Sequence, residues 1–307
     1  MRSGTKWVMC VMGLVASQAM AVELAYTVQP GAKLQRETKM EAEFILLGDI
    51  PGFDKIDGGQ NGSSKIVFEL EEISDAAKVK ITGTREIALT LNEMPMDPAY
   101  MDVGPATLTI GPTGEIMDST LPDFEATEQN LLTLGWLAYI QGQLDVPTLL
   151  PEGGTIAAGK SWTNTVFIKN PAGGQMNGEA TSRVMGTSWN DGKCAWIHSS
   201  VKIPLKLSFK TESGSYKANG DYNVSSVSCF NIDKGFDTER KAFTTAQFQI
   251  VAEGEEQSYN IDIMISGKEV TKVKEVKEEE EKKEASAEAD AAEKKPEEKA
   301  EKKAEEN

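Results

Sequence analysis

Residues 193–231 read KCAWIHSSVKIPLKLSFKTESGSYKANGDYNVSSVSCFN, and this stretch decides the fold. From Cys194 to Phe209 the odd positions are mostly apolar and the even positions mostly polar, which is the alternation of a half-buried strand. After Thr211–Gly214 the apolar residues move to even positions, so a second strand can share one face with the first. The stretch therefore predicts a long β-hairpin.

The same hairpin carries two cysteines near its open end. If the tight loop lies at Thr211–Glu212, Cys194 lies directly opposite Cys229 on the polar face. The Cβ atoms of such pairs lie about 4.5–5.5 Å apart, close to the separation that a disulfide needs. We therefore expect a Cys194–Cys229 disulfide, which would stabilise the fold by about 3–4 kcal/mol on the chain-entropy account.

Residues 1–21 have the pattern of a signal peptide. Arg2 and Lys6 precede the apolar stretch Trp7–Val15, and small residues lead to an expected cleavage after Ala21. A membrane anchor is the alternative, but the apolar stretch is too short to span a bilayer. We expect an exported protein, periplasmic or extracellular, in which the two remaining cysteines are an even number and favour a disulfide.

Composition limits the possible partners. The 307 residues carry a formal net charge of −16, which disfavours binding to nucleic acids and to anionic membrane surfaces. Residues 267–307 are rich in Glu, Lys and Ala, and we expect a disordered tail. The rest divides into an N-terminal β region, 22–147, which ends in a helix, and a C-terminal β region, 148–266; these form either one domain or two.

Most other segments alternate as strands do and are joined by short, turn-rich connections, which predicts neighbouring antiparallel strands. The Gly/Asp-rich run Gly48–Ser64 is interpreted as a mobile loop, and Gly111–Gly114 as a hairpin turn. The other expected strands are Glu23–Gln29, Lys33–Leu47, Lys65–Ile73, Lys78–Leu91, Ala106–Ile110, Glu115–Asp118, Ser161–Lys169, Gly178–Trp189, Arg240–Val251 and Ser258–Ser266.

One segment, Phe124–Leu144, lacks this alternation. Its apolar residues cover most of a helical surface, which predicts one buried helix in the concave face of a curved, half-barrel-like sheet. The residues that would form a cavity wall, or simply pack in the core, are Leu132, Trp136, Tyr139 and Ile140.

Several turns resemble those of a family of uncharacterised secreted bacterial β-rich proteins. The similar elements are the Pro-x-Gly-Gly lead-in at Pro151–Gly154, the Gly-Lys-Ser-Trp turn at Gly159–Trp162 and the turn at Asp233–Gly235. The resemblance covers mainly residues 150–266. It implies an architecture similar to that of periplasmic lipoprotein carriers, and it implies no activity.

No catalytic, metal-binding or cofactor-binding motif stands out. His198 is the single histidine, and its parity places it on the polar face of the hairpin. Gly52–Gly62 lacks the terminal Glu of a calcium loop, and adjacent pairs such as Glu71-Glu72 point to opposite faces of a strand. We predict no catalytic, cofactor or metal residues.

Three hypotheses for the function remain. The first is an exported, non-enzymatic envelope protein that binds an apolar ligand, a lipid or a lipoprotein moiety, in a cavity between sheet and helix. The second is a structural or interaction protein with a filled core, which binds another envelope protein. The third, disfavoured one is a hydrolase that uses carboxylates chosen from 48 acidic residues. None of the three is an integral membrane protein.

Overall fold

The computed structural model describes residues 21–50, 53–73, 76–120, 148–157, 159–189, 192–211, 214–254 and 258–276. The expected signal peptide, the expected helix Phe124–Leu144 and most of the charged tail lie outside these ranges. The described residues form strands and turns and include no helix. Accordingly, they contain no helix that could cross a membrane.

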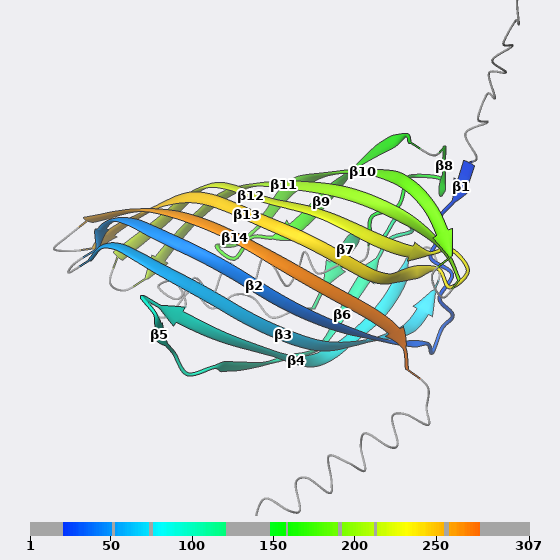
Figure 1. The fold of residues 1–307 in the computed structure, drawn as a ribbon, viewed down its shortest axis with the longest axis horizontal. Coiled ribbons are helices and arrows are strands. Elements are labelled where there is room, and N and C mark those ends of the chain that lie inside the picture. The colour runs from blue at the N-terminus through cyan, green and yellow to red at the C-terminus, as the bar shows by residue number, and fades with distance from the viewer. Residues whose placement is uncertain are drawn as a thin grey trace, which may run out of the picture.

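Twelve of the fourteen strands form one antiparallel sheet, in the order β7-β6-β4-β3-β2-β14-β13-β12-β11-β10-β9, with β5 paired to β4 (Figure 1). The short strands β1 and β8 pair with each other. The bounds are β1 Ala21–Glu23, β2 Lys33–Ile50, β3 Phe53–Ile73, β4 Ala77–Leu91, β5 Met94–Pro95, β6 Ala99–Ile110, β7 Ile116–Ser119, β8 Thr155–Ala157, β9 Ser161–Lys169, β10 Gln175–Trp189, β11 Lys193–Thr211, β12 Gly214–Asn231, β13 Phe236–Gly254 and β14 Ser258–Glu275.

The sheet curves until its two edges approach each other. The edge strands β7 and β9 come into contact, so the sheet is a nearly closed barrel rather than the predicted half-barrel. Long strands have a right-handed twist that accumulates along the sheet, which explains this curvature. The predicted antiparallel β class is confirmed. Strands of both predicted β regions lie in the one sheet, and β2 pairs with β14 where the two regions meet.

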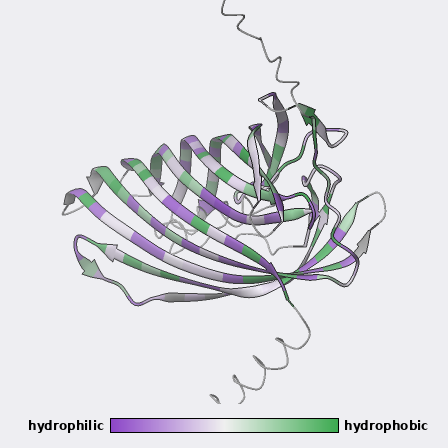
Figure 2. Cartoon of the chain, turned by 45° about the vertical axis from the view of Figure 1, so that its right-hand side comes forward, coloured by the Kyte–Doolittle hydropathy of each residue, from purple (hydrophilic) through white to green (hydrophobic). Residues whose placement is uncertain are grey.

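The two faces of the sheet differ in polarity. In β11 the side chains of Ile203, Leu205 and Leu207 are buried on the inner face. Between them, Lys202 and Lys206 are exposed on the outer face. The same alternation continues along the neighbouring strands, as the banded colouring of Figure 2 shows. The hydrophobic core therefore lies inside the curved sheet.

The central hairpin forms as predicted, with a shifted register. Thr211 pairs with Gly214, so the tight connection lies one residue later than expected. As a result Cys194 pairs with Asn231, and Cys229 pairs with Trp196. Each residue of β11 therefore pairs with a residue of β12 two positions later than predicted. Because side chains alternate with a period of two, every residue keeps its predicted face.

The prediction that Gly48–Ser64 forms a mobile loop is wrong. Strand β2 continues to Ile50, and β3 begins at Phe53 and runs through the glycines. Gly58 pairs with Phe44, and a Cβ atom at Gly58 would lie 2.0 Å from the Phe44 ring. Glycine is tolerated in this strand because a cross-strand aromatic ring occupies the space above it.

Two further boundaries differ from the prediction. Strand β14 continues to Glu275, so the first residues assigned to the tail belong to the sheet. At the other terminus only Ala21–Glu23 forms a strand, whereas a strand was expected over Glu23–Gln29. Residues 24–32 instead cross one end of the barrel, where Leu24 bonds to the Gly154 turn, and Gly31 and Ala32 bond to Leu70 of β3.

Candidate functional site

One end of the barrel is covered by two segments, residues 21–32 and residues 148–155. The backbone N–H of Leu24 donates to the carbonyl of Gly154 over 2.7 Å, and the N–H of Gly31 donates to the carbonyl of Leu70 over 2.7 Å. The Tyr26 hydroxyl donates to the carbonyl of Thr148. These bonds attach the N-terminal residues to the sheet, and we call this part of the molecule the capped end.

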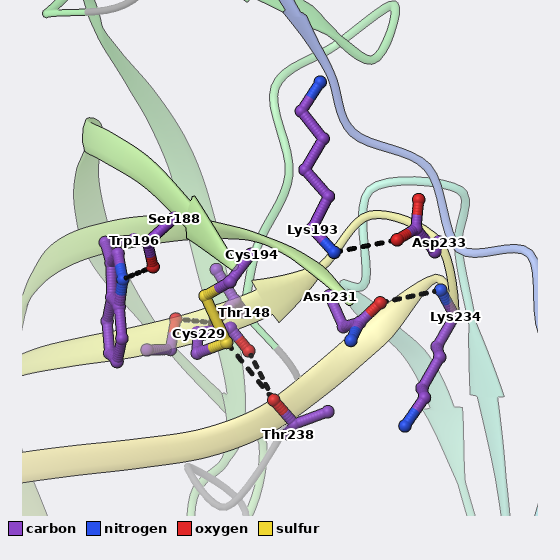
Figure 3. Close-up of a disulfide and its surroundings, with 11 residues drawn as sticks. Thr148, Ser188, Lys193, Cys194, Trp196, Cys229, Asn231, Asp233, Lys234 and Thr238 are labelled. Carbon is purple, nitrogen blue, oxygen red and sulfur yellow. Dashed lines mark hydrogen bonds between the residues drawn. A yellow bond between two sulfur atoms is a disulfide. The ribbon is translucent and has the colours of Figure 1, made fainter. Parts of the chain in front are cut away.

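The Asp233–Gly235 turn, noted in the sequence for its resemblance, has a structural role at the capped end. The amide N–H of Gly235 donates to the carbonyl of Asn231 over 2.8 Å. The amide N–H of Lys193 donates to the Asp233 carboxylate over 2.7 Å (Figure 3). Gly235 has a φ of 70°, and a Cβ atom there would lie 2.1 Å from Thr27 Oγ1. Only glycine lets the N-terminal segment approach the turn this closely.

Beneath this cover lies a cavity of about 560 Å³. Most of its lining is apolar and comes from both halves of the chain, including Leu24, Leu34, Leu70, Val79, Leu150 and Val273. The volume falls within the range of about 300–1,000 Å³ that is typical of small-molecule sites. The cavity is therefore the candidate functional site.

The inner end of the cavity is polar. Arg36, Arg240 and Thr271 contribute to its lining. Arg240 and Thr271 belong to a row of inward-facing polar residues that crosses seven consecutive strands, with one or two residues from each strand. We call this row the polar belt, and its members are Ser182, Ser199, Ser226, Ser228, Arg240, Thr271, Thr38 and Ser64. Across the strands these residues are direct partners, except that β12 supplies both Ser226 and Ser228.

Hydrogen bonds hold the belt together. The hydroxyls of Ser182 and Ser199 share a bond of 2.8 Å, and those of Thr38 and Thr271 share one of 3.0 Å. Thr271 donates to Glu269 Oε1 over 3.0 Å, so Thr38 is the donor to Thr271, because a hydroxyl has one proton. Arg36 lies 4.0 Å from the same carboxylate. These partners offset the cost of burying polar groups among apolar ones.

Asp237 lies where the cavity meets the cap. Its Oδ2 accepts the backbone N–H of Thr148 over 2.7 Å, while within the described part of the chain its buried Oδ1 has no hydrogen-bond partner. Burial raises the pKa of Asp237 above its usual value, although the Thr148 hydrogen bond and the charges of Arg240 and Arg36 act in the opposite direction.

Tyr26 is the second perturbed group at the capped end. Desolvation raises the pKa of Tyr26 well above its ordinary value, and the nearby carboxylates Asp237 and Glu115 raise it further. Its ring lies edge-on to that of Phe230, with centroids 5.5 Å apart. A phenol that stays protonated and is packed in this way acts as an anchor for the cap rather than as an acid or base.

The predicted Cys194–Cys229 disulfide is present and lies next to the capped end (Figure 3). It joins residues offset by two along the hairpin, with Cα atoms 5.5 Å apart. Both cysteines are fully buried, although their parity predicts the polar face. Thr238, beside a bulge in the β12–β13 pairing, lies against Cys229, with 3.2 Å between Oγ1 and Sγ.

The other sequence-based site predictions have different outcomes. The expected cavity wall of Leu132, Trp136, Tyr139 and Ile140 lies outside the described residues, so it stays a prediction. His198 lies on the outer face as expected, half-buried, with Nε2 3.2 Å from Ser225 Oγ. Among the described residues there is no group of three or more His, Cys, Asp or Glu side chains that could hold a metal ion.

Sequence reasoning missed Arg36 and Arg240. Arg36 shares its parity in β2 with Leu34, Met40 and Phe44, all on the face predicted to be inward. Arg240 similarly shares parity with Ala242 and Ala246 in β13. A charged residue at an inward-facing position of an otherwise apolar strand face is the sequence signal that could have identified both arginines.

Comparisons with known proteins do not identify a family. Neither a family model nor a curated protein matches the chain. Among solved structures, a triple mutant of the porin of Rhodopseudomonas blastica is 10% identical, covers 76% of this chain and 99% of its own, and has a TM-score of 0.21. OccK7 (OpdD) of Pseudomonas aeruginosa is 6% identical, covers 80% of this chain and 99% of its own, and has a TM-score of 0.22. Scores this low do not establish a common fold, and the implied similarity to lipoprotein carriers is not shown.

Proposed function

We propose that this chain is an exported, non-enzymatic envelope protein that binds an apolar ligand in the cavity at its capped end. The observation that carries the proposal is the cavity of about 560 Å³, which is lined mainly by apolar side chains and has polar groups at one end. Pockets with this composition are the usual sites of small-molecule binding.

The expected location is the periplasm or the exterior, after cleavage at Ala21. The signal-like sequence of residues 1–21 supports this proposal. The buried Cys194–Cys229 disulfide also supports it, because disulfides persist in oxidising compartments.

The distribution of polarity supports a protein that works in water. Strands that cross a membrane carry apolar side chains outward and polar ones inward. In this sheet the apolar side chains of β11 point inward, and its lysines point outward. The proposal is therefore a carrier or binder of lipid-like molecules that is not an integral membrane protein.

Binding of the neutral, apolar dye Nile red tests the proposal. We expect the wild-type mature protein to bind the dye with one high-affinity site, seen as a blue-shifted fluorescence. Val79→Trp should weaken that binding at least tenfold, because Val79 lines the cavity and the larger ring would fill it.

The matched control is Thr82→Trp, in the same strand but exposed on the outer face, which should leave dye binding unchanged. Circular dichroism of both variants checks that each remains folded. Equal binding by wild type and Val79→Trp would exclude the cavity as the site.

An interaction protein with a filled core is the second candidate. It is supported by Trp189, which is 81% exposed at the end of β10. Large exposed aromatic residues are enriched at protein interfaces. Wild-type protein that binds no dye, and that carries no lipid after purification from its host, would favour this second candidate over the first.

A further inference from the structure

We propose that the ligand is an uncharged single-chain amphiphile, with a hydroxyl head at the inner end of the cavity and its chain along the apolar wall. This inference rests on the proposed function and specifies the chemical class of the ligand. It follows from the order of side chains along the strands, from the pairing of charges around the inner end, and from the mixture of hydrogen-bond donors and acceptors there.

The lining changes from apolar to polar with depth. On the inner face of β2, Leu34 lies toward the capped end and Arg36 lies one step deeper. On β14, Val273 and then Thr271 follow the same order. A ligand that satisfies both zones has an apolar chain near the cap and a polar head at the inner end.

The charges around the inner end are paired within the protein. Arg36 lies 4.0 Å from the carboxylate of Glu269, which faces inward from β14. The carboxylate of Glu239, which also lines the cavity, lies 3.3 Å from the ammonium group of Lys241. Each of these four side chains therefore has a partner of opposite charge before any ligand binds.

The second arginine of the lining is matched as well. The positive charge of Arg240 lowers the pKa of Asp237, so the two groups lie close enough to interact. Arg85 also faces inward, deeper in the barrel, and does not line the cavity. All three inward-facing arginines, Arg36, Arg85 and Arg240, have interaction partners in the protein. The inner end thus offers no unmatched charge to an anion or to a cation.

A charged head would lose its hydration at the inner end without gaining a counter-charge. Arg36 is 5% exposed, so a head beside it is largely removed from water. Burying an ion without a partner costs far more than burying a neutral polar group that is hydrogen-bonded. The remaining charged residues of the lining, Glu23 and Glu152, are exposed at the cap, where water screens them.

The polar groups of the lining favour a hydroxyl among uncharged heads. Arginine side chains only donate hydrogen bonds, whereas the ionised carboxylates of Asp237 and Glu239 only accept them. A hydroxyl both donates and accepts, so it suits this mixed set. The head must also be small, because belt residues such as Thr38 and Thr271 are buried and bonded to each other over 3.0 Å.

Displacement of Nile red from the wild-type protein at neutral pH tests this assignment. The four competitors are dodecanol, dodecanoate, dodecylammonium and methyl dodecyl ether, which share one alkyl chain and differ in the head. We expect dodecanol to bind at least tenfold more tightly than either ion, because neither ion finds a counter-charge. The ether is more apolar but cannot donate, and it should bind about fivefold more weakly than dodecanol, for the loss of one hydrogen bond.

Two variants that unpair the charges should shift the preference in opposite directions. Arg36→Gln leaves the Glu269 carboxylate without this arginine, and dodecylammonium should gain at least tenfold in affinity relative to dodecanol. Glu269→Gln leaves Arg36 without this carboxylate, and dodecanoate should gain by a similar factor. The glutamine can still accept the hydroxyl of Thr271. A general loosening of the fold would not produce shifts of opposite sign.

An ion pair on the outer face provides matched controls. Lys202 and Asp221 lie 3.6 Å apart, and both side chains are exposed. Lys202→Gln and Asp221→Asn make the same changes of charge outside the barrel, so both should keep the wild-type order of the four competitors. Circular dichroism checks that each variant is folded.

The outcomes separate this inference from the proposed function. If either ion, or the ether, binds the wild type as tightly as dodecanol, the hydroxyl assignment is overturned and apolar binding remains. Folded variants that keep the wild-type order would overturn the placement of the head beside Arg36. Failure to bind Nile red or any competitor would overturn the proposed function itself. The wild-type comparison needs no variant, so an unfolded variant would not prevent a decision.

Discussion

At the scale of single residues, Asp237 lies at the edge of the cavity with one carboxylate oxygen that accepts the Thr148 N–H and one that has no hydrogen-bond partner among the residues that the structure describes. Because its folded-state pKa is raised above the usual 3.8, the native state binds the proton more tightly than the unfolded state does. Its contribution to stability is therefore fully present below pH 3.8 and is lost as the pH rises through the raised pKa.

Asp237→Asn should consequently raise the free energy of unfolding at pH 7, with a gain that shrinks to nothing below pH 4. The asparagine Oδ1 can still accept the Thr148 N–H, so the cap keeps its bond. Urea denaturation of both proteins from pH 3 to pH 8 measures the effect. A gain that is constant across this range would show that burial of the charge is not its cause.

Leu205 represents the buried inner face. It is fully buried on β11, so Leu205→Ala should lower the free energy of unfolding by about 2–5 kcal/mol, through lost burial and an added cavity. Its neighbour Lys206 is exposed on the opposite face, and Lys206→Ala should change stability by less than about 0.5 kcal/mol. Equal effects in urea denaturation would mean that the two faces are wrongly assigned.

At the scale of elements, the central hairpin shows why face and register differ in predictability. Alternation states which residues share a face, and this survives a slip of two positions. The register depends on where the tight connection lies, and the sequence around Thr211 and Gly214 allows more than one position. The disulfide was still predictable, because Cys194 and Cys229 lie close together in either register.

The same hairpin gives a prediction on stability. Replacing both Cys194 and Cys229 by Ala should lower the free energy of unfolding by about 2–4 kcal/mol, because the bridge closes a chain segment of 35 residues. Urea denaturation should show this loss, and reductant should destabilise the wild type but not the double variant. A wild type that is insensitive to reductant after full reduction would contradict the prediction.

The capped end illustrates what alternation cannot supply. Leu24 and Tyr26 have strand-like spacing, but the Leu24 N–H donates to the carbonyl of Gly154 and the Tyr26 hydroxyl donates to the carbonyl of Thr148, both far away in sequence. The cavity of about 560 Å³ forms where these distant segments meet, so no local sequence pattern predicts it. The glycines of β3 misled the prediction for a similar reason, since the Phe44 ring that accommodates Gly58 comes from another strand.

At the scale of the whole molecule, the pairing of β2 with β14 joins the two halves of the sheet. The residues that pair here are far apart in the chain, as the hydrogen bond between Thr38 and Thr271 illustrates across 233 positions. Strand β14 also pairs with β13, so it contributes hydrogen bonds on both of its sides.

Two truncations test the importance of this strand. A chain that ends at Val276 should melt at the temperature of the same chain extended to Asn307, since it keeps all of β14. A chain that ends at Gly267 loses the pairing of Lys268–Glu275 with β2 and should melt at least several degrees lower. Both chains lack residues 277–307, so the comparison isolates the strand. Equal melting temperatures would show that these residues contribute little.

The joining strand also has a consequence for biogenesis. In a chain that crosses a membrane from its N-terminus, β2 is the first strand of the twelve-stranded sheet to emerge, long before β14 can reach it. During that interval one side of β2 is an open edge, and open edges of apolar strands pair readily with other chains. With the export proposed above, closure of the sheet would wait until translocation is almost finished, and a chaperone that shields extended strands would raise the yield of the folded protein.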